Sequence, residues 1–336
     1  MSMAIRPPIL EIDRLRVEFD TRAGVVHAVN EVTLKVNKGE TLGIVGESGS
    51  GKSVTAQAVM GLISVPGRIA GGDIRWHGKS IMGRAGEQLG RSLRGKQISI
   101  IFQDPMTSLN PLMSVGDQIC EVLQYHLKLS RSQARRRAEE LLAAAGISAP
   151  RRRLDQHPHE LSGGMRQRVM IAMAIGCEPE LLIADEPTTA LDVTIQAQIL
   201  ELLAELQARL KLSIVLITHD LGIVAGLCHR VAVMYAGRIV ETGTADAIFD
   251  APAHPYTQGL LRSTPSLDAV DESLVSIEGV PPSLLHPPAG CPFLPRCPIG
   301  DSRCEQPPPN VPTPGGHAAC WKAMRPAWLQ PLLRAV

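Results

Sequence analysis

The spacing of apolar residues changes several times along this chain, and each change predicts a different element. Residues 9–45 alternate between apolar and polar positions, as β-strands do, and end in the short apolar run TLGIV (41–45). Further runs at ISIIF (98–102), LLIAD (181–185) and SIVLIT (213–218) predict buried strands. Because helical spacing separates these runs, we predict an α/β fold on a mainly parallel sheet with helices on both faces.

Two of the intervening segments carry helix signals. From 104 to about 178 the chain is mostly helical in pattern, and we expect a helical subdomain there. Within it, SQARRRAEELLAAAG offers Ser132 as the N-cap and Gly146 as the stop. Asp192 precedes another helix, whose apolar positions recur at helical spacing: Ile195, Ile199, Leu202, Leu203, Leu206 and Leu210.

The chain becomes rich in proline after about residue 250. The stretches DAPAHPYTQGLLRSTPS and GVPPSLLHPPAGCPFLPRCP both lie in this part. Proline lacks the N–H group that a sheet ladder needs, so we expect this tail not to continue a regular sheet. We therefore predict a domain over residues 1–250 and a Pro/Cys-rich C-terminal extension over residues 251–336.

Composition narrows the class of protein. The chain has 336 residues, 44% of them hydrophobic and 20% charged, with a net charge of +1. Nucleic-acid-binding proteins usually carry a basic excess, so we expect no nucleic-acid partner. No apolar run reaches the ~18 to 20 residues of a membrane span, and the start, MSMAIRPPILEIDRL, lacks a secretory signal. We expect the protein to stay in the cytoplasm.

The segment GESGSGKS fits the P-loop pattern and lies between a predicted strand and a predicted helix. Glycines let the backbone curl so that its N–H groups point at phosphate oxygens, and the following helix adds its positive end. In this pattern Lys52 faces the β- and γ-phosphates of a bound nucleotide and the Ser53 hydroxyl binds Mg²⁺. The candidate nucleotide-binding residues are Gly46, Glu47, Ser48, Gly49, Ser50, Gly51, Lys52 and Ser53.

Acidic residues follow the strand at 181–185. Asp185 ends that strand, at the edge of an α/β sheet where ligands bind, and can hold Mg²⁺ directly or through water. Glu186 is placed to orient or deprotonate a water molecule. His219 ends the next strand and can polarise the same water or the γ-phosphate. A helix cap or a solvated loop would explain an isolated acidic pair, but the P-loop upstream favours catalysis.

A second phosphate-binding segment, LSGGMRQR (161–168), precedes a predicted helix. Since the chain has one P-loop, this second cradle of Ser162, Gly163 and Gly164 suggests a second protomer. With these motifs the chain closely resembles the ATP-binding-cassette (ABC) ATPases over residues 9 to about 245. LSGG is the defining motif of that family, although Met165 replaces the Gln that usually follows it.

The resemblance implies roles for further residues. Gln103 in IFQDP matches the Q-loop and is expected to act in catalysis and at the Mg²⁺ ion. TALD (189–192) matches the D-loop, which adds Asp192 to the nucleotide contacts, and His219 matches the H-switch. Phe19 lies where the family usually has an aromatic ring that stacks on adenine.

The resemblance also implies an assembly. Two cassettes pair head to tail, so that each ATP lies between the P-loop of one and the LSGG segment of the other. The helical part, 104–178, is expected to rest on a membrane permease. Glu186 is present, so we expect a cassette that hydrolyses ATP.

Two classes of ABC protein compete at this point. Soluble members in chromosome structure or DNA repair insert a long coiled coil between P-loop and signature, and those in translation carry two cassettes, whereas this chain has neither feature. Three stretches resemble the oligopeptide/dipeptide/nickel importer branch: QDPMTSLNPLMSVGDQI, HPYTQGLL and PPSLLHPPAGCPFLPRCP.

That branch implies ATP-driven uptake of dipeptides or oligopeptides, with nickel or another small solute as the alternative and a soluble non-transport ATPase as the less favoured one. The implied partners are a second ABC ATPase in a heterodimer, two transmembrane permeases and an extracytoplasmic substrate-binding protein. The implied location is peripheral, at the cytoplasmic face of the inner membrane.

Four cysteines lie in the extension, at Cys291, Cys297, Cys304 and Cys320. Zinc sites usually include two cysteines two to four residues apart, and none of these gaps is that short. Disulfides are disfavoured in the cytoplasm. The residues alone leave three alternatives, a 4Fe-4S cluster on four thiolates, a zinc site or structural thiols, and the cluster is favoured. The resemblance adds weight to the cluster, since several importer ATPases of this branch carry one here.

Overall fold

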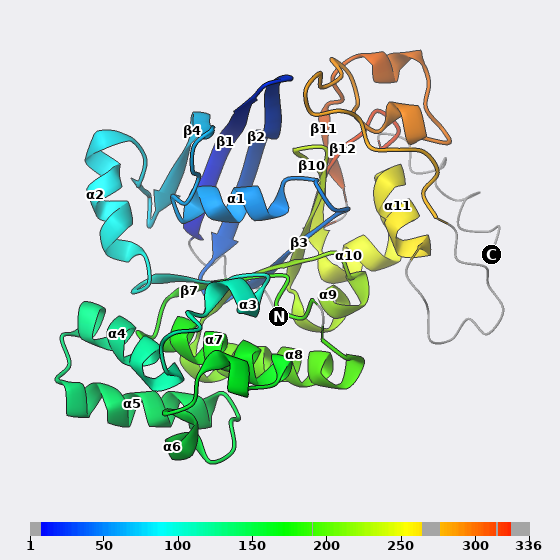
Figure 1. Cartoon of the computed structure of the whole chain (residues 1–336). Coiled ribbons are helices and arrows are strands. Elements are labelled where there is room, and N and C mark those ends of the chain that lie inside the picture. Colours follow the sequence, from blue (N-terminus) through cyan, green and yellow to red (C-terminus); the bar gives the residue numbers. More distant parts are fainter. Residues whose placement is uncertain (1–7, 190, 264–275, 314, 324–336) are drawn as a thin grey trace. The chain divides into compact units, whose positions relative to one another are not determined.

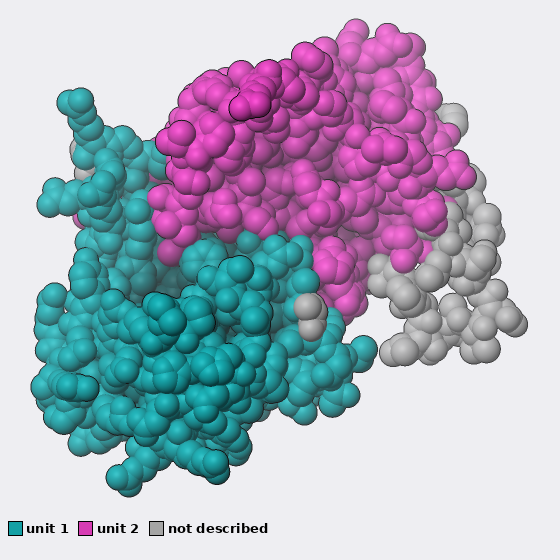
Figure 2. All heavy atoms as spheres, in the orientation of Figure 1, with its two compact units in different colours: residues 1–8, 36–40, 81–217 teal, residues 9–35, 41–80, 218–336 magenta. Residues whose placement is uncertain are grey.

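The computed structural model describes residues 8–189, 191–263, 276–313 and 315–323 (Figure 1). The chain divides into two compact units, coloured separately in Figure 2. Unit 1 takes in Pro8 and residues 36–40 and 81–217, and unit 2 takes in residues 9–35, 41–80 and the described residues from 218 onward.

A parallel sheet forms the centre of unit 1. Its strands lie in the order β8 (Ser213–Thr218), β7 (Leu181–Asp185), β6 (Ile98–Ile101). Every residue of β7 and β8 is buried. A parallel strand covered on both faces consists mainly of apolar residues, which is why these strands were visible as short apolar runs in the sequence.

Helices make up most of the rest of unit 1, and the prediction that 104–178 is mostly helical is confirmed, whereas the helical subdomain stays a prediction. Helices α4, α5 and α7 pack against one another in this segment, and α8 follows β7 (Figure 1). The helices of the unit are α2 (Gly83–Leu93), α3 (Pro105–Ser108), α4 (Val115–Leu127), α5 (Arg131–Ala144), α6 (Pro150–Arg153), the 3₁₀ turn Pro158–Glu160, α7 (Gly163–Ile175) and α8 (Val193–Leu210).

The start of α5 differs from the prediction, because Ser130 and not Ser132 is its N-cap. The Ser130 hydroxyl accepts a hydrogen bond from Gln133 N (3.4 Å), and the Gln133 side chain accepts one from Ser130 N (2.9 Å). This reciprocal capping box satisfies two backbone donors that the first turn leaves unpaired. Gly146, at φ 74°, follows the end of the helix as predicted.

Unit 2 contains two groups of strands. One has the order β2 (Gly24–Asn37), β1 (Pro8–Thr21), β4 (Gly67–Trp76), β5 (Lys79–Ser80), with antiparallel pairing from β1 to β5. The other has the order β3 (Thr41–Val45), β9 (Arg230–Tyr235), β10 (Arg238–Thr244), β12 (Gly316–Ala319), β11 (Asn310–Thr313). The helices of the unit are α1 (Lys52–Val59), α9 (Leu221–Leu227), α10 (Ala245–Asp250), α11 (Pro255–Arg262) and the 3₁₀ turns Leu294–Arg296 and Ser302–Glu305.

The C-terminal extension continues the second group of strands, so the expectation that it would not continue a sheet was wrong. Strand β12 pairs antiparallel with β10, with Thr242 opposite His317, and β11 pairs with β12. Pro312 lies in β11, the last strand in this order. Proline is tolerated in an edge strand, because one side of such a strand needs no N–H donors.

An aromatic cluster packs the extension onto β9. The rings of Tyr256 and Phe293 lie 4.5 and 5.3 Å from that of Tyr235, measured between ring centroids. All three side chains are fully buried.

Strand β3 and the extension belong to the same unit, so the two units do not divide at residue 250. The domain boundary proposed at that residue stays a prediction.

None of the helices in the described part of the chain has both the length and the apolar character needed to cross a membrane.

The capping box of α5 can be tested with a matched pair of variants. Ser130→Ala removes the hydroxyl that caps the helix, and we expect it to lower the free energy of unfolding by about 1 kcal/mol. Ser132→Ala is the control, because it removes only the contact between the two serine hydroxyls (3.3 Å) and leaves the Ser130 cap in place, so it should cost less than Ser130→Ala. Chemical denaturation of the full chain measures both values, and equal losses would contradict the assignment of Ser130.

Candidate active site

The P-loop connects β3 to α1, as the sequence predicted. Residues 46–51 form the loop, and α1 begins at Lys52. Three of its residues have positive φ angles: Gly46 (153°), Gly49 (76°) and Gly51 (103°). These angles turn successive N–H groups toward one centre, which is the geometry that binds phosphate.

Two of these glycines are also required by close packing. A Cβ atom at Gly46 would collide with the carbonyl oxygen of Met234, and one at Gly51 would collide with that of Ala28. Gly49 has no neighbouring atom within 4 Å of such a position. The loop is therefore pressed against the backbone of unit 2 at both ends and open at its middle.

Polar groups inside the loop fit a bound phosphate. Lys52 is buried, and its ammonium donates hydrogen bonds to the carbonyl oxygens of Gly46 (2.8 Å) and Glu47 (2.9 Å). The buried Ser50 hydroxyl has no hydrogen-bond partner among the described residues. A buried cation and an unpaired hydroxyl within a glycine cradle suit the triphosphate of ATP, and the Ser53 hydroxyl stands at the start of α1 beside Lys52.

In unit 1, the predicted catalytic carboxylate lies at the end of β7. Asp185 is buried as the last residue of the strand, and Glu186 follows with φ 46°. One oxygen of Glu186, Oε2, accepts hydrogen bonds from Gln103 Nε2 and from Thr189 Oγ1, each 2.9 Å long. Its backbone N–H donates to Ile217 O (2.9 Å). These contacts fix the direction in which the carboxylate points.

The LSGG segment forms an exposed helix start in the same unit. Ser162 is the N-cap of α7, and its hydroxyl accepts from Met165 N (3.4 Å). Ser162 and Gly163 are exposed, and a Cβ at Gly164 would lie 2.7 Å from Ile195 of α8. An exposed helix N-terminus with unpaired N–H groups attracts anions. Asp192 caps α8 by accepting from Ile195 N (2.9 Å).

The remaining predicted residues lie in unit 2. His219 is exposed and directly follows β8. Phe19 is half-buried in β1 opposite Gly67. Its ring fills the space that a side chain at position 67 would occupy. The roles predicted for both residues, in hydrolysis and adenine stacking, stay predictions.

Two residues that the sequence did not single out contact the P-loop from the extension. The Tyr256 hydroxyl accepts a hydrogen bond from Glu47 N (2.8 Å), and Arg296 pairs with both carboxylate oxygens of Glu47 (2.8 and 3.0 Å). Both lie in stretches, HPY and LPRC, that the sequence marked only as typical of a branch. No local pattern connects them with residue 47.

The prediction of a metal cluster is not supported. All four cysteines of the extension are free thiols, and three are buried. Burial raises the pKa of each thiol whose shift is resolved, that of Cys297 to about 11. Within the described ranges, no group of three or more His, Cys, Asp or Glu side chains is arranged to hold a metal ion.

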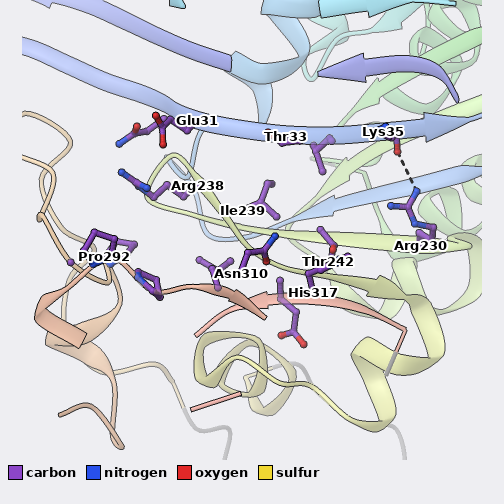
Figure 3. Close-up of a pocket in the computed structure, with 18 residues that line it drawn as sticks. Glu31, Thr33, Lys35, Arg230, Arg238, Ile239, Thr242, Pro292, Asn310 and His317 are labelled. Atoms are coloured by element: carbon purple, nitrogen blue, oxygen red, sulfur yellow. Dashed lines mark hydrogen bonds between the residues drawn. The ribbon is translucent and has the colours of Figure 1, made fainter. Parts of the chain in front are cut away.

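A separate cavity of about 470 Å³ lies between β2 and the strands β10–β12 (Figure 3). Glu31, Thr33 and Lys35 line one side, and Arg238 and His317 are among the residues opposite. None of the P-loop residues lines it. The cavity is therefore not the predicted nucleotide site.

A P-loop, a carboxylate at a strand end and an exposed LSGG helix together define an ATP-binding cassette. The family model described as ABC transporter matches residues 29–189, and the model described as oligopeptide/dipeptide transporter, C-terminal region, matches residues 240–304. The chain belongs to the family of ABC transporter ATPases.

Curated relatives extend the similarity over nearly the whole chain. The chain is 53% identical to the oligopeptide transport ATP-binding protein OppD of Escherichia coli K12, over 94% of this chain and 93% of that protein. It is 57% identical to OppD of Bacillus subtilis 168, over 86% and 81%. It is 52% identical to the dipeptide transport ATP-binding protein DppD of Escherichia coli K12, over 93% and 96%.

Solved structures share the cassette fold. One is cbiO1 of Clostridium perfringens, part of the ABC transporter complex cbiONQ, with a TM-score of 0.61, 32% identity and coverage of 73% of this chain and 91% of that one. Another is the dimeric cassette MJ0796 bound to ADP and phosphate, with a TM-score of 0.62, 25% identity and coverage of 70% and 98%.

The packing of the P-loop can be tested with two glycine variants. Gly51→Ala combines a positive φ with a backbone collision, so we expect a loss of about 3 kcal/mol in stability and at least about tenfold weaker ATP binding. Gly49→Ala carries the backbone strain alone and should cost about 1 kcal/mol. Thermal unfolding and equilibrium ATP binding measure these effects. The packing argument would be contradicted if the two variants behaved alike.

Proposed function

We propose that this chain is the ATP-binding and ATP-hydrolysing subunit of a bacterial importer of oligopeptides or dipeptides. The observation that carries hydrolysis is the orientation of Glu186 by Gln103 and Thr189 at the end of β7. The peptide substrate is supported by the names of relatives that are more than 50% identical over more than 80% of both chains.

In this proposal, residues 46–53 bind the phosphates of ATP. Lys52 exchanges its bonds to the Gly46 and Glu47 carbonyl oxygens for the β- and γ-phosphates. Ser53, Gln103 and Asp185 would hold Mg²⁺, which neutralises charge on the phosphates. Phe19 stacks on adenine.

Hydrolysis breaks the bond between the γ-phosphorus and the oxygen of ADP as a water oxygen attacks that phosphorus. Glu186 accepts the proton of the water, and its direction is set by the two bonds on Oε2. His219 polarises the γ-phosphate or the same water. The products are ADP and inorganic phosphate.

The proposed assembly contains two cassettes, two permeases and an extracytoplasmic binding protein. Ser162, Gly163 and Gly164 of each cassette contact the ATP held by the other, and Asp192 lies near that contact. The exposure of Ser162 and Gly163 supports such an interface. The second cassette is a related ATPase subunit, and the helices within 104–178 rest on a permease at the cytoplasmic face of the inner membrane.

The variant Glu186→Gln tests the proposed base. It keeps the size of the side chain and its contact with Gln103 but removes the basic carboxylate. We expect ATP turnover to fall by about 10²- to 10⁴-fold while ATP binding stays within about twofold. Turnover is measured in the purified assembly with the partner cassette's own site disabled.

The matched control is Glu201→Gln, an exposed glutamate on α8. Its turnover should stay within about twofold of the parent protein, as for other surface substitutions. Unchanged turnover in Glu186→Gln would show that another group activates the water.

The sequence also predicts a metal cluster on four cysteines of the extension, and metal analysis tests this prediction. A 4Fe-4S cluster on Cys291, Cys297, Cys304 and Cys320 predicts iron in the anaerobically purified protein and a brown absorption band in the visible range. A zinc site predicts zinc and no colour. Structural thiols without a metal predict neither iron nor zinc. The measurement therefore distinguishes the cluster, the zinc site and the structural thiols.

A further inference from the structure

Arg296 of the extension is more extensively bonded than any role as a surface arginine requires. Its side chain is only 5% exposed. Nη1 and Nη2 donate to the two carboxylate oxygens of Glu47, at 2.8 and 3.0 Å, in the bidentate geometry that is strongest for this pair. Glu47 is the residue that follows the first glycine of the P-loop.

The remaining donors of this guanidinium are also used. Nη1 donates to the Tyr235 hydroxyl (3.3 Å), Nη2 donates to Ile277 O (3.0 Å), and Nε donates to Glu278 O (3.0 Å). With the two bonds to Glu47, all five N–H donors of the arginine have partners. Lysine, with three donors on one nitrogen, cannot reproduce this planar set of contacts.

Glu47 is in turn held at three different groups. Arg296 holds its carboxylate, and the Tyr256 hydroxyl accepts from its N–H (2.8 Å). Lys52 donates to its carbonyl oxygen (2.9 Å), a bond that the proposed binding of ATP replaces. Two of these three partners belong to the C-terminal part of the chain, more than 200 residues away in sequence. The extension therefore fixes one residue of the phosphate cradle from outside the loop.

This restraint matters because the loop has few bonds of its own, among them the one from Ser50 N to Glu47 O (3.2 Å). Gly46, Gly49 and Gly51 all have positive φ angles, and glycine has the largest conformational freedom to lose on becoming ordered. A loop that is already ordered spares ATP that loss when it binds, and its affinity rises accordingly. Holding Glu47, next to Gly46, reduces the freedom of the loop at its first turn.

We propose that Arg296 is a positioning residue for ATP binding, which acts through Glu47 to hold the P-loop in its phosphate-binding conformation. The C-terminal extension thereby sets the nucleotide affinity of the cassette. This inference rests on the proposed function, because it requires residues 46–53 to bind ATP.

The test measures the dissociation constant of ATP for the full chain, in a Glu186→Gln background so that ATP is not consumed. Arg296→Met removes every donor and keeps most of the side-chain volume. We expect ATP to bind at least about tenfold more weakly. Arg296→Lys keeps the charge but loses the bidentate contact, and it should fall between the parent and Arg296→Met.

The matched control is Arg303→Met. Arg303 lies in the same extension and, like Arg296, directly precedes a cysteine. It pairs with Asp301 at 2.8 Å and is 52% exposed. This variant should bind ATP within about twofold of the parent, as surface substitutions do.

A double-mutant cycle separates positioning from mere stabilisation of the extension. Glu47→Gln removes the charged partner and leaves the extension intact, so we expect it also to weaken ATP binding. Because both residues act through one contact, the double variant should bind ATP no more weakly than whichever single variant binds ATP less tightly. Binding is measured below the unfolding temperature of each variant, where a lower melting temperature alone leaves the dissociation constant unchanged.

Four results would overturn the proposal. One is that Arg296→Met and Glu47→Gln both bind ATP as tightly as the parent. Another is that the dissociation constant of the double variant rises by the product of the two single fold-changes. If Arg296→Met does not fold, Arg296→Lys and Glu47→Gln carry the same test, and normal binding by both overturns it. If the parent itself binds no ATP, the proposed nucleotide site fails and this inference falls with it.

Discussion

The curl of the P-loop depends on three glycines with positive φ, and these same glycines leave the loop few side chains with which to keep that curl. The structure supplies the missing restraint from its surroundings. The carbonyl oxygens of Met234 and Ala28 pack so closely against Gly46 and Gly51 that neither position has space for a Cβ atom. The loop therefore cannot move toward those two carbonyl groups. Lys52 ties two loop carbonyl oxygens together from within.

The C-terminal extension is part of the surroundings that restrain the P-loop. It has little apolar core of its own, and it obtains one by placing Tyr256 and Phe293 against Tyr235 of β9. Buried Glu241 of β10 strengthens this attachment by accepting hydrogen bonds from Ala253 N (2.6 Å) and His254 N (3.0 Å). A segment docked in this way can present a side chain to the P-loop.

Local patterns predicted the elements well where neighbouring residues decide the outcome. The strands β3, β6, β7 and β8 were visible as apolar runs, because a strand buried on both faces consists mainly of apolar residues. The cap of α5 was assigned to Ser132, although the Ser130–Gln133 spacing of a capping box was present in the sequence. Strands β11 and β12 were missed, because they form by pairing with β10, whose residues Glu241 and Thr242 lie opposite Ala318 and His317.

The sequence by itself determined the family and the chemistry of the site, since the P-loop, LSGG and the Asp185–Glu186 pair are contiguous motifs whose function depends on local backbone geometry. Only the tertiary structure decided which distant groups hold those motifs in place. Gln103 meets Glu186 across 83 residues, and Arg296 meets Glu47 across 249. A buried polar group must find a hydrogen-bond partner, but packing selects that partner, and no periodicity along the chain records the selection.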